Sequence, residues 1–285
     1  MSYLDLAARG KTSFWRYLVT WPVAFILAIL LIVIVILPLV LLQVLPREFA
    51  EQMQSPAHPL PFYLGAGLSF GAVLVGFAVA IALFQKKAPG DIVGDWRWSR
   101  FATGAVVWLV LLVVGCLIDY VLRPQGFVWT ADSISLPVVL AAVVGLAVQT
   151  FAEEFIFRGY MTQAFLHWVK RPVVASVLSG LLFGVFHIPN GIPQAVAATM
   201  FGMASAYVAI RTGSLAATYG IHLVNNVFAA IVVVSTDDIF HGAPALWSQQ
   251  TPELLWGDVA FEVVALAVVL FVFARRKKTS VDFTD

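Results

Sequence analysis

The chain has 285 residues, of which 61% are hydrophobic and only 12% are charged, and its formal net charge is +1. Soluble domains usually carry about 25% charged and about 45–50% apolar residues, so this composition excludes an ordinary soluble enzyme and a disordered chain. The small net charge provides no basic face, which excludes a nucleic-acid-binding protein. The single cysteine, Cys116, cannot form a disulfide within the chain.

Long apolar runs predict a polytopic membrane protein, because a helix needs roughly 20 apolar residues to cross a bilayer. In chain order, the predicted spans are residues 17–45, 61–84, 101–122, 136–157, 172–187, 193–210, 215–234 and 259–274. Pro189 and Pro193 predict a tight reversal between the fifth and sixth spans. The predicted fold class is therefore all-α, a single transmembrane bundle of about eight helices over residues 1–285.

The positions of Lys and Arg predict the orientation of this bundle. Most of them lie before the first span, after the last span, or in alternate connections, and only Arg47 and Arg123 fall on the opposite side. By the positive-inside rule, we expect both termini in the cytoplasm. The basic cluster at 275–278 is expected to contact lipid headgroups.

Ionisable residues inside spans are costly and are therefore the first functional candidates. The fourth span ends with Glu153, Glu154 and, four residues later, Arg158. Glu154 and Arg158 share one helical face in a favourable order for an ion pair. Because adjacent helical residues project about 100° apart, we expect Glu154 to hold Arg158 and Glu153 to remain available for chemistry. The alternative is a surface ion pair at a helix end.

Two further spans carry histidine at positions where apolar residues are expected. His187 ends the fifth span, four residues after Phe183, and His222 lies in the seventh span, four residues before Asn226. Each pair shares a helical face. A single intramembrane histidine is commonly an interhelical hydrogen-bond partner. Together with the glutamate pair, however, two imidazoles and a carboxamide form a plausible hydrolytic set.

The depths of these residues in the bilayer test whether they can form a single site. Counting along the predicted spans places Glu153 near the cytoplasmic side, His222 at mid-depth and His187 near the far side. The three side chains converge only if the fourth helix continues past Phe157, or if Pro172 lies below the membrane surface. Elsewhere, Asp119 and Asn225 are expected to make structural hydrogen bonds.

The three motifs resemble those of the CAAX protease and bacteriocin-processing (CPBP, Abi) family of intramembrane endopeptidases, which includes the Ras-converting prenyl-protein protease. In this sequence they read Glu153-Glu154-x-x-x-Arg158, Phe183-x-x-x-His187 and His222-x-x-x-Asn226. The resemblance covers roughly residues 136–234, which we interpret as the catalytic core. Residues 1–135 and 235–285 are interpreted as peripheral helices, with a C-terminal tail.

The resemblance implies a role for each motif residue. Glu153 would be the general base, and His187 would help it hold and activate the attacking water. His222 and Asn226 would stabilise the oxyanion of the tetrahedral intermediate. Glu154, Arg158 and Phe183 would support the site.

The sequence allows two interpretations, a site that binds a metal ion and a site that does not. Glu153, His187 and His222 also form a donor set known from catalytic zinc sites, so a zinc-dependent protease is an alternative. The compact His-Glu-x-x-His signature is absent from the sequence, and the interpretation without a cofactor is favoured.

The resemblance also suggests the setting in which the protein acts. We expect a multi-pass protein of a bacterial inner (plasma) membrane that contacts lipid and cleaves membrane-associated peptides, either prenylated CAAX-type peptides or leader peptides. No nucleic acid is expected as a partner, and the sequence makes no prediction of oligomeric state. A non-catalytic protein that confers bacteriocin immunity or binds peptide in the same cavity is the alternative from another functional class.

Overall fold

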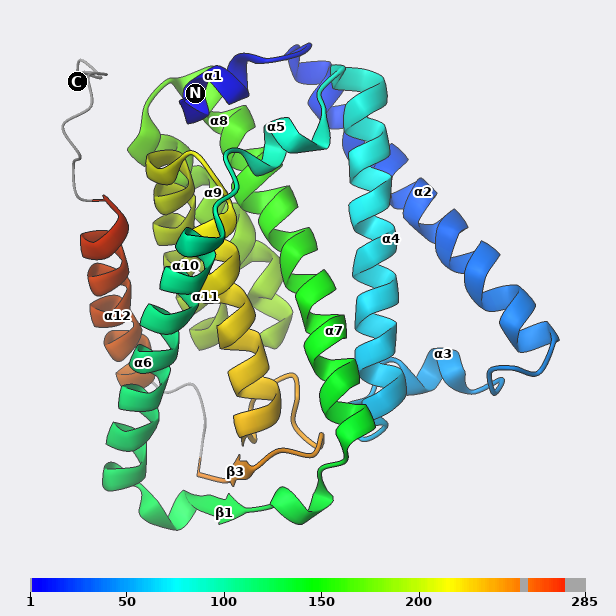
Figure 1. Ribbon diagram of the computed structural model, residues 1–285, viewed down its shortest axis with the longest axis vertical. Coiled ribbons are helices and arrows are strands. Elements are labelled where there is room, and N and C mark those ends of the chain that lie inside the picture. The colour runs from blue at the N-terminus through cyan, green and yellow to red at the C-terminus, as the bar shows by residue number, and fades with distance from the viewer. Residues whose placement is uncertain (1, 252–255, 275–285) are drawn as a thin grey trace.

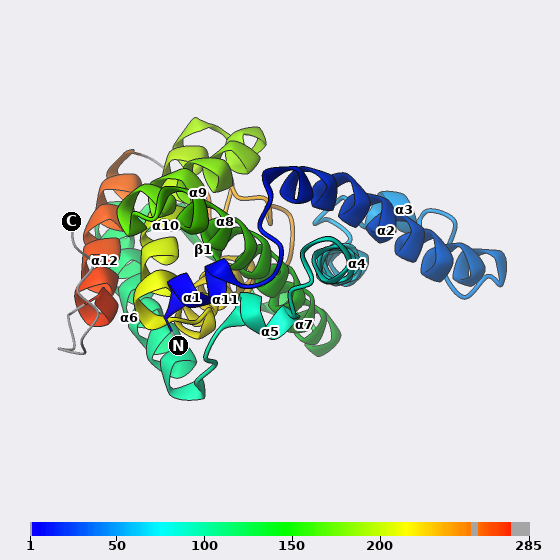
Figure 2. The same cartoon turned by 90° about the horizontal axis from the view of Figure 1, so that it is seen from above.

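A computed structural model describes residues 2–251 and 256–274, which form a bundle of long helices (Figures 1 and 2). The helices are α1 (Tyr3–Ala8), α2 (Phe14–Leu41), α3 (Phe49–Gln52), α4 (Pro59–Gln85), α5 (Pro89–Val93), α6 (Trp98–Leu122), α7 (Leu136–Glu153), α8 (Thr162–Val169), α9 (Pro172–His187), α10 (Ile192–Thr212), α11 (Ala216–Val227) and α12 (Trp256–Ala274). Short 3-10 turns lie at Pro124–Gly126, Ala131–Ser133 and Ile188–Asn190, and π-helical segments at η3 (Glu154–Met161) and η5 (Phe228–Val232). The basic cluster at 275–278 lies outside the described residues.

The predicted all-α membrane bundle is confirmed. Among the described residues, seven helices are long and apolar enough to cross a membrane, and the predicted seventh span is a shorter apolar helix over Ala216–Val232. Large apolar side chains such as Ile26, Leu30 and Ile34 of α2 are exposed on the outside of the bundle, as expected of a surface that faces lipid. The chain is therefore an integral, multi-pass membrane protein.

The centre of the bundle is built around a close pair of helices. A Cβ on Gly180 of α9 would overlap Met203 of α10, and one on Gly184 would overlap Thr199. Small residues at four-residue spacing thus allow α9 and α10 to approach closely. The predicted reversal between them is also confirmed, because a 3-10 turn at Ile188–Asn190 and Gly191, with φ +103°, separate the two helices.

The fourth span continues well past its predicted end at Phe157. Helix α7, the π-helix η3 and helix α8 form one continuous apolar helix over Leu136–Val169. The π-helix carries i→i+5 hydrogen bonds and is a rare form that is frequent at functional sites. Hydropathy marks how long an apolar run is, but it does not distinguish a buried helical extension from a loop.

A small β-sheet lies at the end of the bundle away from α1 (Figure 1). Strands β1 (Phe127–Trp129), β3 (Trp247–Gln249) and β2 (Val233–Ser235) pair in that order, β1 with β3 antiparallel and β2 with β3 parallel. Strands β1 and β3 lie in connections between predicted spans, whereas β2 contains the last two residues of the predicted seventh span, which is therefore helical only to Val232. Each strand has only three residues, too few for an alternating pattern to be visible in the sequence.

Candidate active site

The two glutamates lie where the fourth helix changes from α to π geometry. Glu153 is the last residue of α7, and Glu154 is the first residue of η3. Every side chain of η3 is buried, including the ionisable Glu154 and Arg158, each of which is fully buried. Because a buried charge requires a partner, the surroundings of these two side chains decide how the site works.

His222 of α11 lies between the two carboxylates. Its Nδ1 is 2.9 Å from Oε1 of Glu154, and its Nε2 is 3.5 Å from Oε2 of Glu153. The expectation that the two glutamates occupy separate environments is therefore wrong. Their side chains are long enough to converge on one imidazole from adjacent positions, and the helix widens from Glu154 onward.

Arg158 forms the predicted ion pair with Glu154, with 3.4 Å between Nε and Oε1. Its guanidinium lies over the ring of Phe183, 3.9 Å from the ring centroid, and 5.4 Å from the centroid of Phe201. Within the described part of the chain, the guanidinium nitrogens and Oε2 of Glu154 have no hydrogen-bond partner. The guanidinium is thus held by charge and by aromatic faces, and its hydrogen-bonding capacity remains available.

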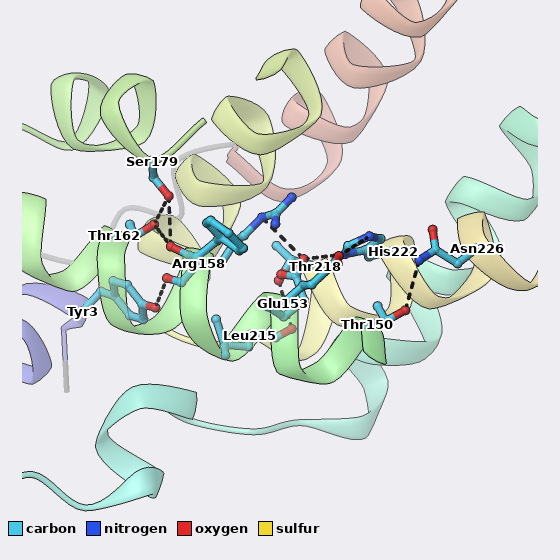
Figure 3. Close-up of polar contacts among 12 residues, drawn as sticks. Tyr3, Thr150, Glu153, Arg158, Thr162, Ser179, Leu215, Thr218, His222 and Asn226 are labelled. Carbon is cyan, nitrogen blue, oxygen red and sulfur yellow. Dashed lines mark hydrogen bonds and ion pairs between the residues drawn. The ribbon is translucent and has the colours of Figure 1, made fainter. Parts of the chain in front are cut away.

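Side chains from other elements bind carbonyl groups of the π-helix (Figure 3). The hydroxyl of Tyr3 in α1 donates to the carbonyl oxygen of Arg158 at 2.6 Å. Thr162 and Ser179 both donate to the carbonyl oxygen of Phe157, at 2.9 Å each. These hydroxyls stabilise the segment that carries Glu154 and Arg158. The motifs alone did not identify them, because none of the three residues belongs to a motif, and the contacts of Tyr3 and Ser179 join residues that are 155 and 22 positions apart.

His187 also packs against Phe183. Its Nδ1 is 2.8 Å from the carbonyl oxygen of Phe183, and the two rings are 4.3 Å apart. The ring of His222 packs edge-on against the same Phe183 at 5.9 Å. Continuation of the fourth helix past Phe157 thus meets the first of the two conditions for convergence. Phe183 is the common neighbour of Arg158, His187 and His222.

Asn226 of α11 binds two side chains of α7. Its Nδ2 donates to Oε1 of Gln149 at 3.0 Å and to Oγ1 of Thr150 at 3.3 Å, and Figure 3 shows it pointing toward Thr150. Asn225 lies behind it, because Nδ2 of Asn225 donates to Oδ1 of Asn226 at 3.2 Å and Nε1 of Trp108 donates to Oδ1 of Asn225 at 3.1 Å. The interhelical role expected for Asn225 is confirmed.

The donor arrangement bears on the zinc alternative. Among the described residues, no group of three or more His, Cys, Asp or Glu side chains is placed to hold a metal ion. Both ring nitrogens of His222 face carboxylates, and Nδ1 of His187 faces a carbonyl group. The side chains as placed therefore do not fit a zinc site.

Comparison with known proteins confirms the motif resemblance for this part of the chain. Residues 135–228 match the family described as "Rce1-like: Type II CAAX prenyl endopeptidase Rce1-like". The chain is also 27% identical over 192 residues to the uncharacterized protein YyaK of Bacillus subtilis (strain 168), and this match covers 64% of either protein. The matched part thus spans less than two thirds of that relative. No solved structure gives a significant match.

Proposed function

Because residues 135–228 are Rce1-like in sequence, we propose that this protein is an intramembrane endopeptidase that hydrolyses peptide bonds with an activated water molecule. The observation that carries the proposal is the placement of His222 between the carboxylates of Glu153 and Glu154. A buried imidazole between two carboxylates is a proton-transfer arrangement, and simple packing of α7 against α11 does not require it.

The charges of the cluster define where a proton can be held. Two carboxylates and the guanidinium of Arg158 leave one negative charge that is not balanced. A proton held in advance on Nε2 of His222, which lies 3.5 Å from Oε2 of Glu153, would balance this charge, and the proton released by the attacking water would go to Glu153. Since a carboxylate accepts hydrogen bonds, Glu154 holds the imidazole with the proton on Nδ1. Protonated His222 would then present its Nε2–H toward the reaction site.

His187 is poised to bind the attacking water. The carbonyl oxygen of Phe183 can only accept, so the hydrogen bond at 2.8 Å requires the proton on Nδ1 of His187. In the neutral ring, Nε2 then carries the lone pair and can accept a hydrogen bond from water. Glu153, with 12% of its side chain exposed, would remove the proton as general base.

Two groups would stabilise the oxyanion that forms when water attacks the peptide carbonyl. One is protonated Nε2 of His222, and the other is Nδ2 of Asn226, which now binds Gln149 and Thr150. Donors directed at a developing oxyanion are typically worth about 2.7–4 kcal/mol each. Glu153 would then deliver its proton to the leaving amine, which completes hydrolysis.

The proposal is tested with purified full-length protein and quenched prenyl-peptide and membrane-anchored peptide substrates. We expect wild-type protein to cleave, Glu153→Gln to lose cleavage, and Glu48→Gln, at an exposed carboxylate, to retain it. Unchanged melting temperatures would show that Glu153→Gln folds. Cleavage that survives Glu153→Gln contradicts the proposed base. Peptide binding without cleavage by wild-type protein supports the immunity or peptide-binding alternative.

A further inference from the structure

Helix α6 meets the candidate site through one large buried side chain. Of its 25 residues, all within the described part of the chain, only Gly104 and Trp108 are buried. A Cβ on Gly104 would overlap the carbonyl group of Ala217 in α11, so the two helices approach closely at this point. One turn later, the ring of Trp108 packs edge-on against Phe201 of α10, with 5.6 Å between the ring centroids. Trp108 is thus held beside α11, although α6 lies outside the residues that match the family.

The indole N–H of Trp108 begins a chain of hydrogen bonds that ends on α7. Nε1 of Trp108 donates to Oδ1 of Asn225 at 3.1 Å, and Nδ2 of Asn225 donates to Oδ1 of Asn226 at 3.2 Å. Nδ2 of Asn226 then donates to Oε1 of Gln149 at 3.0 Å and to Oγ1 of Thr150 at 3.3 Å (Figure 3). The chain therefore connects α6 to the carboxamide that the proposed mechanism uses.

Only the first member of this chain has a fixed polarity. An indole N–H donates and cannot accept, whereas a carboxamide can turn over and exchange its oxygen with its NH₂ group. Because Trp108 donates, Asn225 must turn its oxygen toward the indole and its NH₂ group toward Asn226. Asn226 must then accept through its oxygen, which leaves its NH₂ group as the donor that faces α7. Gln149 and Thr150 impose no direction, since the amide can turn over and the hydroxyl can donate or accept.

The direction of the chain decides whether Asn226 can act on an oxyanion. In the reversed direction, its carbonyl oxygen would lie where the developing oxyanion needs a donor, and the two oxygens would repel each other. In the direction set by Trp108, one hydrogen of Nδ2 stays on Gln149. The other hydrogen makes the longer contact with Thr150, which can be exchanged for the oxyanion.

Packing of α6 against α11 does not by itself require this chain. The close approach of the two helices needs only small residues at their crossing, such as Gly104. An apolar side chain at position 108 would fill the same space against Phe201. The one polar atom of the Trp108 side chain is nevertheless placed on Asn225, next in the chain to Asn226.

We propose that Trp108 is a positioning residue that sets the orientation of the Asn226 carboxamide through Asn225. The inference rests on the proposed endopeptidase function, in which Asn226 is an oxyanion donor. It gives α6 a part in the reaction, although the sequence places this helix among the peripheral ones. Trp108 itself does not touch the reacting atoms, so its effect on cleavage must depend on Asn225.

Trp108→Phe in the full-length protein tests this dependence. The substitution keeps an aromatic ring against Phe201 but removes the N–H, so both directions of the chain become accessible and kcat should fall several-fold with little change in KM. In an Asn225→Leu background, in which the chain is already interrupted, Trp108→Phe should lower kcat no further. Trp98→Phe, at an exposed ring, should leave kcat unchanged. An unchanged kcat in Trp108→Phe, or additive losses in the double variant, overturns the proposal.

Asn225→Asp reverses the chain rather than interrupting it. An ionised carboxylate has only acceptors, so at alkaline pH it would accept from Trp108 and also from Asn226, whose NH₂ group would turn away from α7. Since loss of one oxyanion donor lowers kcat by about 100–1,000-fold, we expect a fall of that size and a parallel loss of affinity for a peptide phosphinate, an uncleavable analogue of the tetrahedral intermediate. Gln194→Glu, which adds the same charge to the wall of a cavity that Asn225 also lines, should change neither quantity. A variant that is merely destabilised would lower the melting temperature without this parallel loss, and equal losses in both variants contradict the proposal.

Nuclear magnetic resonance of detergent-solubilised protein with isotope-labelled tryptophan measures the first hydrogen bond without cleavage. The indole N–H signal of Trp108 is identified by its loss in Trp108→Phe. We expect this signal to shift in Asn225→Leu and to stay in place in Gln194→Glu. A signal that ignores Asn225→Leu overturns the proposal even where peptides are cleaved. A signal that responds in a wild-type protein that cleaves no peptide contradicts the proposed function instead, so the two failures are distinguishable.

Discussion

Nδ1 of His222 lies 2.9 Å from Oε1 of Glu154, a carboxylate that is fully buried and also faces the guanidinium of Arg158. The contact joins α11 to the π-helix and sets which nitrogen of the imidazole carries the proton. Glu154 is thus a positioning residue for His222. Glu154 positions His222 through its charge rather than through its volume. A glutamine at this position would fill the same space without the charge.

Glu154→Gln tests this role. Gln preserves the shape but can turn its NH₂ group toward Nδ1, which would favour the other tautomer and remove the charge that stabilises protonated His222. We expect cleavage to fall by at least about 100-fold, by analogy with the loss of an orienting carboxylate in a catalytic triad. The assay follows cleavage with pH, since a structural role alone would lower activity without shifting the profile. Glu51→Gln in α3 is a control on a carboxylate remote from the site.

Arg158→Lys tests the stacked guanidinium. Lys keeps the positive charge but lacks the planar group that lies over Phe183 at 3.9 Å. A desolvated cation–π contact contributes about 2 kcal/mol, so the melting temperature should fall measurably. Arg211→Lys, at an exposed position, should leave it unchanged. Equal melting temperatures for both variants would contradict a stabilising role for the stack.

The sequence was sufficient to predict the helices, and it led to the hypothesis for the candidate site. Long apolar runs located the spans, and polar residues within them were conspicuous because each is costly in a membrane. In the structure, His222 lies beside Glu153 and Phe183, His187 packs on Phe183, and Asn226 binds Gln149. All four residues lie on helices that the hydropathy pattern predicts.

The local geometry of the site could not be predicted in the same way. A π-helix changes hydrogen bonding from i→i+4 to i→i+5 without changing hydropathy, so its start at Glu154 left no mark in the sequence pattern. The contact between Tyr3 and Arg158 joins residues 155 positions apart, and no local periodicity encodes it. The strands at β1, β2 and β3 are too short to show alternation.

Tyr3→Phe tests whether α1 supports the π-helix. The substitution removes the hydroxyl that donates to the carbonyl oxygen of Arg158 at 2.6 Å. A buried carbonyl left without its donor costs about 1–3 kcal/mol, and the strain falls on the segment that carries Glu154. We expect kcat to fall several-fold with little change in KM, since Tyr3 contacts a backbone carbonyl group of the π-helix and none of the side chains proposed to act on the substrate. Tyr120→Phe, at an exposed ring, should change neither, and a change in KM alone would count against the positioning role.

Metal removal tests the zinc alternative directly. Since the described donors do not form a metal-binding group, we expect purified protein dialysed against EDTA to retain full cleavage activity. Loss of activity on dialysis, with recovery on addition of one equivalent of Zn²⁺ but not Mg²⁺, would overturn this expectation. Metal analysis of the same samples separates removal of bound zinc from inhibition by the chelator.

The pH dependence of stability should report the buried Lys87, which lies between α4 and α5, outside the spans. Burial lowers the pKa of Lys87 to about 8 from its ordinary value of 10.5, while Asp91 opposes this shift and Arg9 adds to it. Between these two values, the unfolded chain binds more protons at this side chain than the folded chain. Stability therefore rises as pH increases from 8 toward 10.5, by up to about 3 kcal/mol, and is constant below this range.

Thermal unfolding of detergent-solubilised protein between pH 7.5 and 9.5 measures this slope. We expect the melting temperature of wild-type protein to rise across the range and that of Lys87→Met to stay level. The slope is the readout, because Lys87→Met also leaves Oε1 of Gln163 without its donor and lowers stability at every pH. Lys86→Met, at the exposed neighbouring position, should keep the wild-type slope. A slope that persists in Lys87→Met would assign the pH dependence to another group.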